Sequence, residues 1–182
     1  MKLRRLFRAA EPHPAVGALY RSVVDQSRLP VFYARLGVQD CPDGRFDMIV
    51  LHMVLLLSRL RQGGKETAEL TQNLFDYMFA DMDQNLREMG VGDLAVGKRI
   101  KAMAQGFYGR LAAYDKAIES GQPQNISASL HRNLYRTGAP TNTQLDVMAA
   151  YVLREAEALG RQSLEDLMNG TVRFGEPDLP EV

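Results

Sequence analysis

Residues 43–60, DGRFDMIVLHMVLLLSRL, decide the fold class that this chain is expected to adopt. Their apolar side chains recur at intervals of three and four residues, which is the spacing of one helical face. The set comprises Phe46, Ile49, Val50, Met53, Val54 and Leu57, with Leu51, Leu55 and Leu56 alongside. Because this face is nearly all apolar, we expect the central core helix here, with Asp43 capping its first turn.

The segments on either side carry further helical patterns. They predict helices at residues 15–27, 31–36, 65–89 and 94–119, from Asn125 or Ser127 to Tyr135, from Thr141 or Asn142 to Leu159, and one short turn from Ser163. The link Gly90–Asp93 is short, and Asp93 can cap the helix after it, which favours an antiparallel pair. Only residues 170–175 resemble a strand. We therefore predict an all-α, single-domain helical bundle with two or three long helices and several short ones.

Three regions are expected along the 182 residues. Residues 1–14 form a basic, flexible N-terminal segment, residues 15–168 form the helical domain, and residues 169–182 form an irregular C-terminal tail with two prolines. The length suffices to bury a core without disulfides or metals.

Composition excludes several functional classes. The 22 basic and 22 acidic residues cancel, so no overall field attracts DNA, and any electrostatic docking must be local. Cys41 is the only cysteine, which excludes an internal disulfide and favours a reducing compartment. The longest apolar run, residues 48–57, is about half of the roughly 20 residues that a membrane-spanning helix needs. We expect no transmembrane segment.

The polar residues do not form a recognisable catalytic or metal-binding motif. Acidic residues gather near the second long helix, at Asp76, Asp81, Asp83, Glu88 and Asp93, but the Glu-x-x-His pairs of a di-iron bundle are missing. A solvated stripe or arginine partners is the favoured interpretation. His52, inside the most apolar helix, is interpreted as a buried, hydrogen-bonded histidine, and Cys41 stays unassigned. We expect no enzyme activity, no cofactor and no metal.

Two other features suit binding. Lys2, Arg4, Arg5 and Arg8 alternate with apolar residues and could contact a membrane surface or a ribosome, or could form a solubilising tail. Gly106 and Gly109 lie in mid-helix, where glycine costs roughly 1 kcal/mol against alanine, so a partner helix or a bound client segment is expected close to them.

Several long strings occur in an order that resembles a known family. They are DGRFDM (43–48), LH (51–52), RL (59–60), LFDYMFADMD (74–83), LREMGVGDL (86–94), VGK (96–98) and FYGR (107–110). Together they resemble the ubiquinol-cytochrome c chaperone family over roughly residues 17–120.

The resemblance implies a helical assembly chaperone. Its client would be cytochrome b, nascent or newly inserted, on the way into the quinol:cytochrome c oxidoreductase (bc) complex. The sequence lacks a long N-terminal targeting extension, which implies a bacterial-type member. Such a member would act in the cytoplasm or peripherally at the inner face of the inner membrane.

A client-binding surface is expected where adaptable apolar side chains meet a charged rim. The candidates are Met78, Phe79, Asp81, Met82, Asp83, Arg87, Glu88, Met89, Val91, Leu94, Phe107, Tyr108 and Arg110. The same residues could instead be the core and turn of a helical hairpin. Two other functions stay open: a carrier of a bulky apolar cofactor such as haem, with His52 or a methionine as ligand, and a structural adaptor that uses the acidic helix face.

Overall fold

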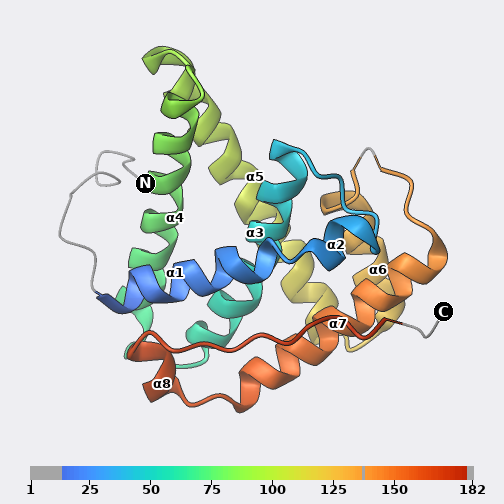
Figure 1. Cartoon of the computed structure of the whole chain (residues 1–182). Coiled ribbons are helices and arrows are strands. Elements are labelled where there is room, and N and C mark those ends of the chain that lie inside the picture. The colour runs from blue at the N-terminus through green and yellow to red at the C-terminus, as the bar shows by residue number, and fades with distance from the viewer. Residues whose placement is uncertain (1–13, 137, 180–182) are drawn as a thin grey trace.

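Helix α3 (Pro42–Arg61) lies at the centre of the molecule. The computed structural model describes residues 14–136 and 138–179, and within them the chain forms helices and no strand (Figure 1). Every residue from Asp47 to Leu57 is buried, and α3 contacts α1, α4, α5 and α7. The predicted all-α class and the central position of this helix are confirmed.

The start of α3 differs from the prediction. Cys41, not Asp43, is the capping residue, and its Sγ accepts a hydrogen bond from the Gly44 backbone N–H at 3.5 Å. The reason is Pro42, which fits the first helical position because it lacks an N–H and has a suitable φ. Asp43 instead lies in the first turn, where its charge favours the helix dipole.

Two shorter helices precede α3. Helix α1 (Pro14–Ser27) crosses α3 and α4, and it buries Val16, Leu19 and Val23. Helix α2 (Pro30–Ala34) begins at the proline and buries Phe32. Both helices were predicted to within two residues of these bounds.

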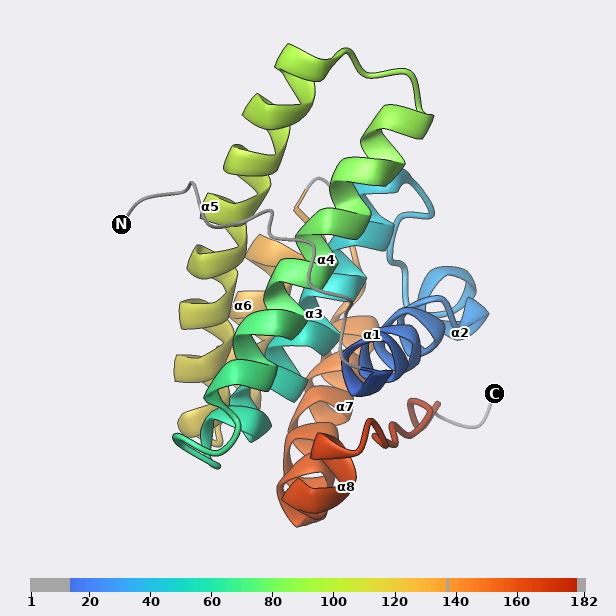
Figure 2. The ribbon, with the colours of Figure 1, turned by 90° about the vertical axis from the view of Figure 1, so that its left-hand side faces the viewer.

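The α4–α5 hairpin, formed by α4 (Ala68–Glu88), the short link and α5 (Asp93–Glu119), extends beyond the rest of the bundle (Figure 2). The predicted antiparallel pair is confirmed. Gly92, rather than Asp93, is the capping residue of α5. The Gly92 carbonyl already accepts hydrogen bonds from the backbone N–H groups of Ala95 and Val96.

The C-terminal half adds α6 (Pro123–Asn133), α7 (Asn142–Arg161) and α8 (Leu164–Met168). Thr141 caps α7, and the side chains of Thr141 and Gln144 each accept a hydrogen bond from the other residue's backbone N–H. Ser163 caps α8. Both helix starts agree with the predictions. The expected start of α6 at Asn125 or Ser127 is wrong. The helix begins at Pro123, where the ring sets the first turn.

Residues 169–179 contain no helix or strand, yet they pack along the bundle. In Figure 1 this tail runs back from α8 below α1 towards the far end of α7. Side chains hold its backbone: Gln162 binds both the N–H and the carbonyl of Arg173, at 2.9 and 2.8 Å. Gly175 is held in the same way, since Glu155 accepts from its N–H at 2.9 Å and Gln26 donates to its carbonyl at 2.6 Å.

Candidate functional site

The turn of the α4–α5 hairpin is fixed by its backbone. Gly90 has a φ of +81°, which a residue with a side chain adopts only at a cost. Its N–H donates to the Arg87 carbonyl at 2.9 Å, and the N–H of Val91 donates to the Leu86 carbonyl at 3.0 Å. This is a Schellman motif, and it satisfies carbonyls that the end of α4 would otherwise leave unpaired.

Charged side chains brace the same turn. Arg87 pairs with Asp83 on its own helix and with Asp93 at the start of α5. Arg87 and Asp93 are exposed and Asp83 is half-buried, so each pair contributes little stability, but the Arg87–Asp93 pair ties the two helices across the link. Two members of the acidic set therefore have an arginine partner, as one of the predicted interpretations proposed.

The hairpin carries the exposed apolar side chains. Across the part of the chain that the structure describes, the exposed large hydrophobic residues are Met89, Leu94 and Tyr108, with exposed fractions of 64, 96 and 50%. All three belong to the link or to α5. Packing within the described part of the chain thus leaves the apolar surface of these three side chains in water.

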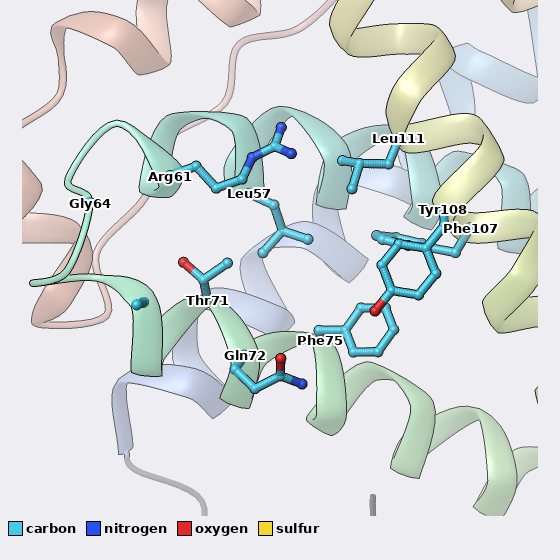
Figure 3. A pocket seen from close by; sticks show the side chains of 10 residues that line it. Leu57, Arg61, Gly64, Thr71, Gln72, Phe75, Phe107, Tyr108 and Leu111 are labelled. Carbon is cyan, nitrogen blue, oxygen red and sulfur yellow. The ribbon is translucent and has the colours of Figure 1, made fainter. Parts of the chain in front are cut away.

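A groove of about 380 Å³ lies where α3, α4 and α5 meet (Figure 3). Its lining consists of Leu57, Arg61, Gly64, Ala68, Thr71, Gln72, Phe75, Phe107, Tyr108 and Leu111. The close-up shows the Tyr108 and Phe75 rings beside each other, with Leu57 and Leu111 across the opening. The groove is therefore mainly apolar, with polar side chains around it.

Aromatic contacts make one wall of this groove rigid. The Phe75 ring centroid lies 5.3 Å from that of Phe107 and 5.3 Å from that of Tyr108, and Phe79 packs behind at 4.8 Å from Phe75. Such pairs add about 0.5–1.5 kcal/mol each beyond area burial. Burial is the main cause that raises the pKa of the Tyr108 hydroxyl above its usual value, and the nearby charge of Asp76 raises it further.

The rim of the groove is held by polar pairs. Arg61 donates to Asp115 of α5 at 2.6 Å, and Ser58 donates to the other oxygen of the same carboxylate. On α4, Gln72 donates to Asp76 at 2.9 Å. The guanidinium and the amide thus stand at the edge of an apolar opening, where polar groups can fix the orientation of a bound ligand.

The predicted client-binding residues divide into two groups. Met78, Phe79, Met82 and Phe107 are buried and belong to the hydrophobic core. Met89, Leu94 and Tyr108 are exposed, and Val91 is half-buried. The groove lining includes Phe107 of the first group and Tyr108 of the second, and none of the others.

The predicted charged residues also have partners. Asp81 accepts a hydrogen bond from the Tyr20 hydroxyl of α1 at 2.8 Å, and Glu88 accepts one from Gln84 at 2.8 Å. The Asp81 contact joins the hairpin to α1. Lys2, Arg4, Arg5 and Arg8 lie outside the described residues.

Arg110 points into the bundle rather than towards the groove. Its Nη2 lies 2.8 Å from Oδ1 of the buried Asp47, and Arg136 approaches the other oxygen at 3.4 Å. The Arg110 contact does not have the geometry of a hydrogen bond, so charge holds the pair. Burial, partly offset by the two arginines, raises the pKa of Asp47 to about 6.

Several groove residues were not predicted. Leu57, Arg61, Gln72, Phe75 and Leu111 come from three helices, and they meet only after those helices have packed. Phe75 could have been found, because Phe75 and Phe79 are one helical turn apart and Phe107-Tyr108 provides two more aromatic rings.

His52 is buried and fully hydrogen-bonded, as predicted. Its Nδ1 lies 2.9 Å from the Met48 carbonyl, which can only accept, so Nδ1 carries the proton. Nε2 then accepts from the Tyr151 hydroxyl at 2.7 Å. Burial lowers the pKa of His52 to about 4, which keeps the ring neutral. A haem ligand needs a free ring nitrogen, and His52 has none.

Residues 14–136 and 138–179 contain no group of three or more histidine, cysteine, aspartate or glutamate side chains placed to hold a metal ion. Among the described residues, none of the helices combines the length and hydropathy that a bilayer crossing requires.

Comparison with known proteins gives consistent matches. The sequence model of the ubiquinol-cytochrome C chaperone family matches residues 34–174. Ubiquinol-cytochrome c reductase complex assembly factor 1 of Mus musculus is 27% identical over 157 residues, covering 86% of this chain and 53% of that protein. The Homo sapiens protein of the same name is 25% identical over 150 residues, covering 82% and 50%. The chain thus spans about half the length of these curated relatives.

A solved structure extends the match to three dimensions. The crystal structure of the Cbp3 homolog from Brucella abortus superposes with a TM-score of 0.80 at 34% sequence identity. The superposition covers 89% of each chain, so the fold described above is shared over nearly its whole length.

Proposed function

Because the chain belongs to the ubiquinol-cytochrome C chaperone family, we propose that it is an assembly chaperone that binds newly made cytochrome b. In this role it supports assembly of the quinol:cytochrome c oxidoreductase complex. It performs no chemistry on its client, and it acts in the cytoplasm or peripherally at the inner face of the membrane that receives the client.

One observation carries the proposal: an apolar groove with a polar rim lies where α3, α4 and α5 meet, and the exposed Tyr108 is part of its lining. A client built of membrane-spanning helices exposes large apolar surfaces before it is assembled. An amphipathic or apolar helix binds such a groove by inserting side chains spaced three and four residues apart. The groove volume suits a few side chains, not a whole helix.

The residues have distinct roles in this proposal. Tyr108 and Phe75 form the aromatic wall that contacts the client, while Arg61 and Gln72 orient it from the rim. The buried Phe107 keeps the wall in place. Client contact extends from here along the hairpin towards Met89, Val91 and Leu94, with Asp81, Asp83, Arg87 and Glu88 as the charged surroundings.

Site-specific photo-crosslinking tests this assignment. A crosslinking amino acid at position 108 or 72 is expected to capture cytochrome b in cells that make it. The same amino acid at Glu157, which is exposed on α7, is the control and should capture none. Failure to capture cytochrome b from the groove positions contradicts the proposal.

A second variant tests the groove itself. Ala68→Trp places a large ring in the groove lining, and it should reduce co-purification of cytochrome b at least several-fold. Ala128→Trp adds the same ring at an exposed position of α6 and should leave co-purification unchanged. Equal effects of the two variants would show that the groove does not bind the client.

A further inference from the structure

The two helices of the hairpin differ in charge. Between Leu94 and Tyr114, α5 has four basic residues and no acidic one. Helix α4 has five acidic residues and one basic residue, Arg87. A chain whose formal net charge is zero therefore carries a local basic surface along α5.

Three of these basic residues are available for a partner. Lys98, Arg99 and Lys101 are exposed, and within the described part of the chain none of them has an ion-pair partner. The fourth, Arg110, neutralises the buried Asp47 instead. The free positive charge thus lies in the second and third turns of α5, close to the hairpin turn.

Apolar side chains stand beside these charges. Leu94 is 96% exposed and Met89 is 64% exposed. Leu94, Lys98 and Lys101 are spaced by four and three residues, so they share one face of α5. The turn lies at the end of the hairpin that extends furthest from the bundle, where a flat surface can reach it (Figure 2).

We propose that this hairpin tip, defined as Met89, Leu94, Lys98, Arg99 and Lys101, binds the surface of an anionic lipid membrane. Leucine and methionine insert among the lipid chains near the headgroups, and the three cations bind acidic headgroups. The turn also carries Asp83, Glu88 and Asp93. Asp83 and Asp93 pair with Arg87, and Glu88 accepts a hydrogen bond from Gln84, whereas the three cations lie further along α5.

The apolar residues distinguish a membrane from a nucleic acid. RNA phosphates would also attract the three cations, but a phosphate backbone offers no apolar phase for Leu94 or Met89. A bilayer offers both. The proposal can be tested apart from the groove, since the tip residues do not line it and the groove experiments probe positions 68, 72 and 108.

Vesicle flotation of the full chain tests the proposal. The chain is mixed with vesicles of phosphatidylcholine alone, or with 30 mol% phosphatidylglycerol, at low and high salt. Binding is expected with the anionic vesicles and should weaken with salt. The double variant K98E/K101E should lower partitioning about tenfold or more, because each cation near an anionic surface contributes a factor of about five. Leu94→Ser should lower it several-fold without changing charge.

Matched controls make the outcome decisive. The double variant K65E/R132E changes the net charge equally at exposed positions away from the tip, and it should bind like the unmodified chain. All variants keep residues 1–13, so a contribution from that segment is common to them. No binding to anionic vesicles, or equal binding by all variants, overturns the proposal. Stronger binding to an RNA duplex, unaffected by Leu94→Ser, overturns it in favour of a nucleic-acid surface.

Discussion

His52 and Asp47 are buried titratable residues, and burial shifts their pKa values in opposite directions. The pKa of His52 is lowered, whereas the pKa of Asp47 is raised. The pKa of His52 is lowered from 6.5 to about 4, so the unfolded chain binds the extra proton between these values. The pKa of Asp47 is raised from 3.8 to about 6, so between these two pH values the folded chain binds a proton that the unfolded chain does not. As the pH falls from 6.5 to 4, His52 therefore destabilises the fold and Asp47 stabilises it, each by roughly 3 kcal/mol.

Separating the two residues should reveal these opposing effects. In His52→Asn the Asp47 contribution remains, so the free energy of unfolding should rise as the pH falls from 6.5 to 4.5. In Asp47→Asn it should fall over the same interval, because His52 alone remains. Urea unfolding at several pH values measures both slopes. The test compares how the free energy of unfolding changes with pH, not its absolute value, because Asp47→Asn also leaves Arg110 and Arg136 without their counter-charge. Two variants with the same slope would contradict the assignment.

At the scale of elements, the hairpin contains two glycines with different structural requirements, Gly90 at the end of α4 and Gly109 within α5. Gly90 needs its positive φ to end α4, whereas Gly109 lies in α5 with nothing within 4 Å of where a Cβ would be. The sequence led us to expect a neighbouring segment at Gly109, and the structure leaves that space open.

Opposite effects of alanine are therefore expected at these two sites. Gly109→Ala should stabilise the chain by about 1 kcal/mol, through the lower backbone entropy of alanine in a helix. Gly90→Ala should destabilise it by about 1–2 kcal/mol, the cost of a left-handed backbone with a side chain. Chemical denaturation provides both values. Destabilisation by Gly109→Ala would indicate a close contact at that surface.

The helices could be predicted because their apolar periodicity is long and regular, as in residues 43–60. Helix starts were less predictable: Pro42 and Pro123 set the first turn where a polar capping residue was expected further along. The hairpin was also predicted, as part of the candidate surface. The sequence did not predict which side of the hairpin faces inward. Apolar residues cover a wide arc of α4, and only packing against α1 and α3 decides which of them are buried.

The tail illustrates what periodicity cannot show. Residues 169–179 have no repeating apolar pattern, yet side chains of α1 and α7 hold their backbone. Phe174 packs against the His52 ring with centroids 5.4 Å apart, which closes the core from that side. Such a contact joins residues more than a hundred positions apart and leaves no local signal in the sequence.

On the scale of the whole molecule, the bundle combines a fixed centre with an arm that has few supports. Helix α3 is surrounded by four helices, whereas the end of the hairpin is held by its own turn and by exposed ion pairs. Local opening is easiest where buried apolar contacts are fewest. The surface proposed for the membrane thus lies on the part of the fold that can adjust without disturbing the core, whereas the groove is anchored to α3.

Hydrogen exchange should resolve this difference in stability along the chain. Amides of residues 48–57 are expected to exchange only through global unfolding, because they lie in a helix buried on all sides. Amides of residues 86–96 should exchange through local opening, at a free energy several kcal/mol lower. Exchange monitored by mass spectrometry at increasing urea distinguishes the two, since only global opening is strongly denaturant-dependent. If both segments exchanged with the same free energy and the same denaturant dependence, the hairpin would be an integral part of the cooperative core, and its end could not adjust to a client or a membrane independently.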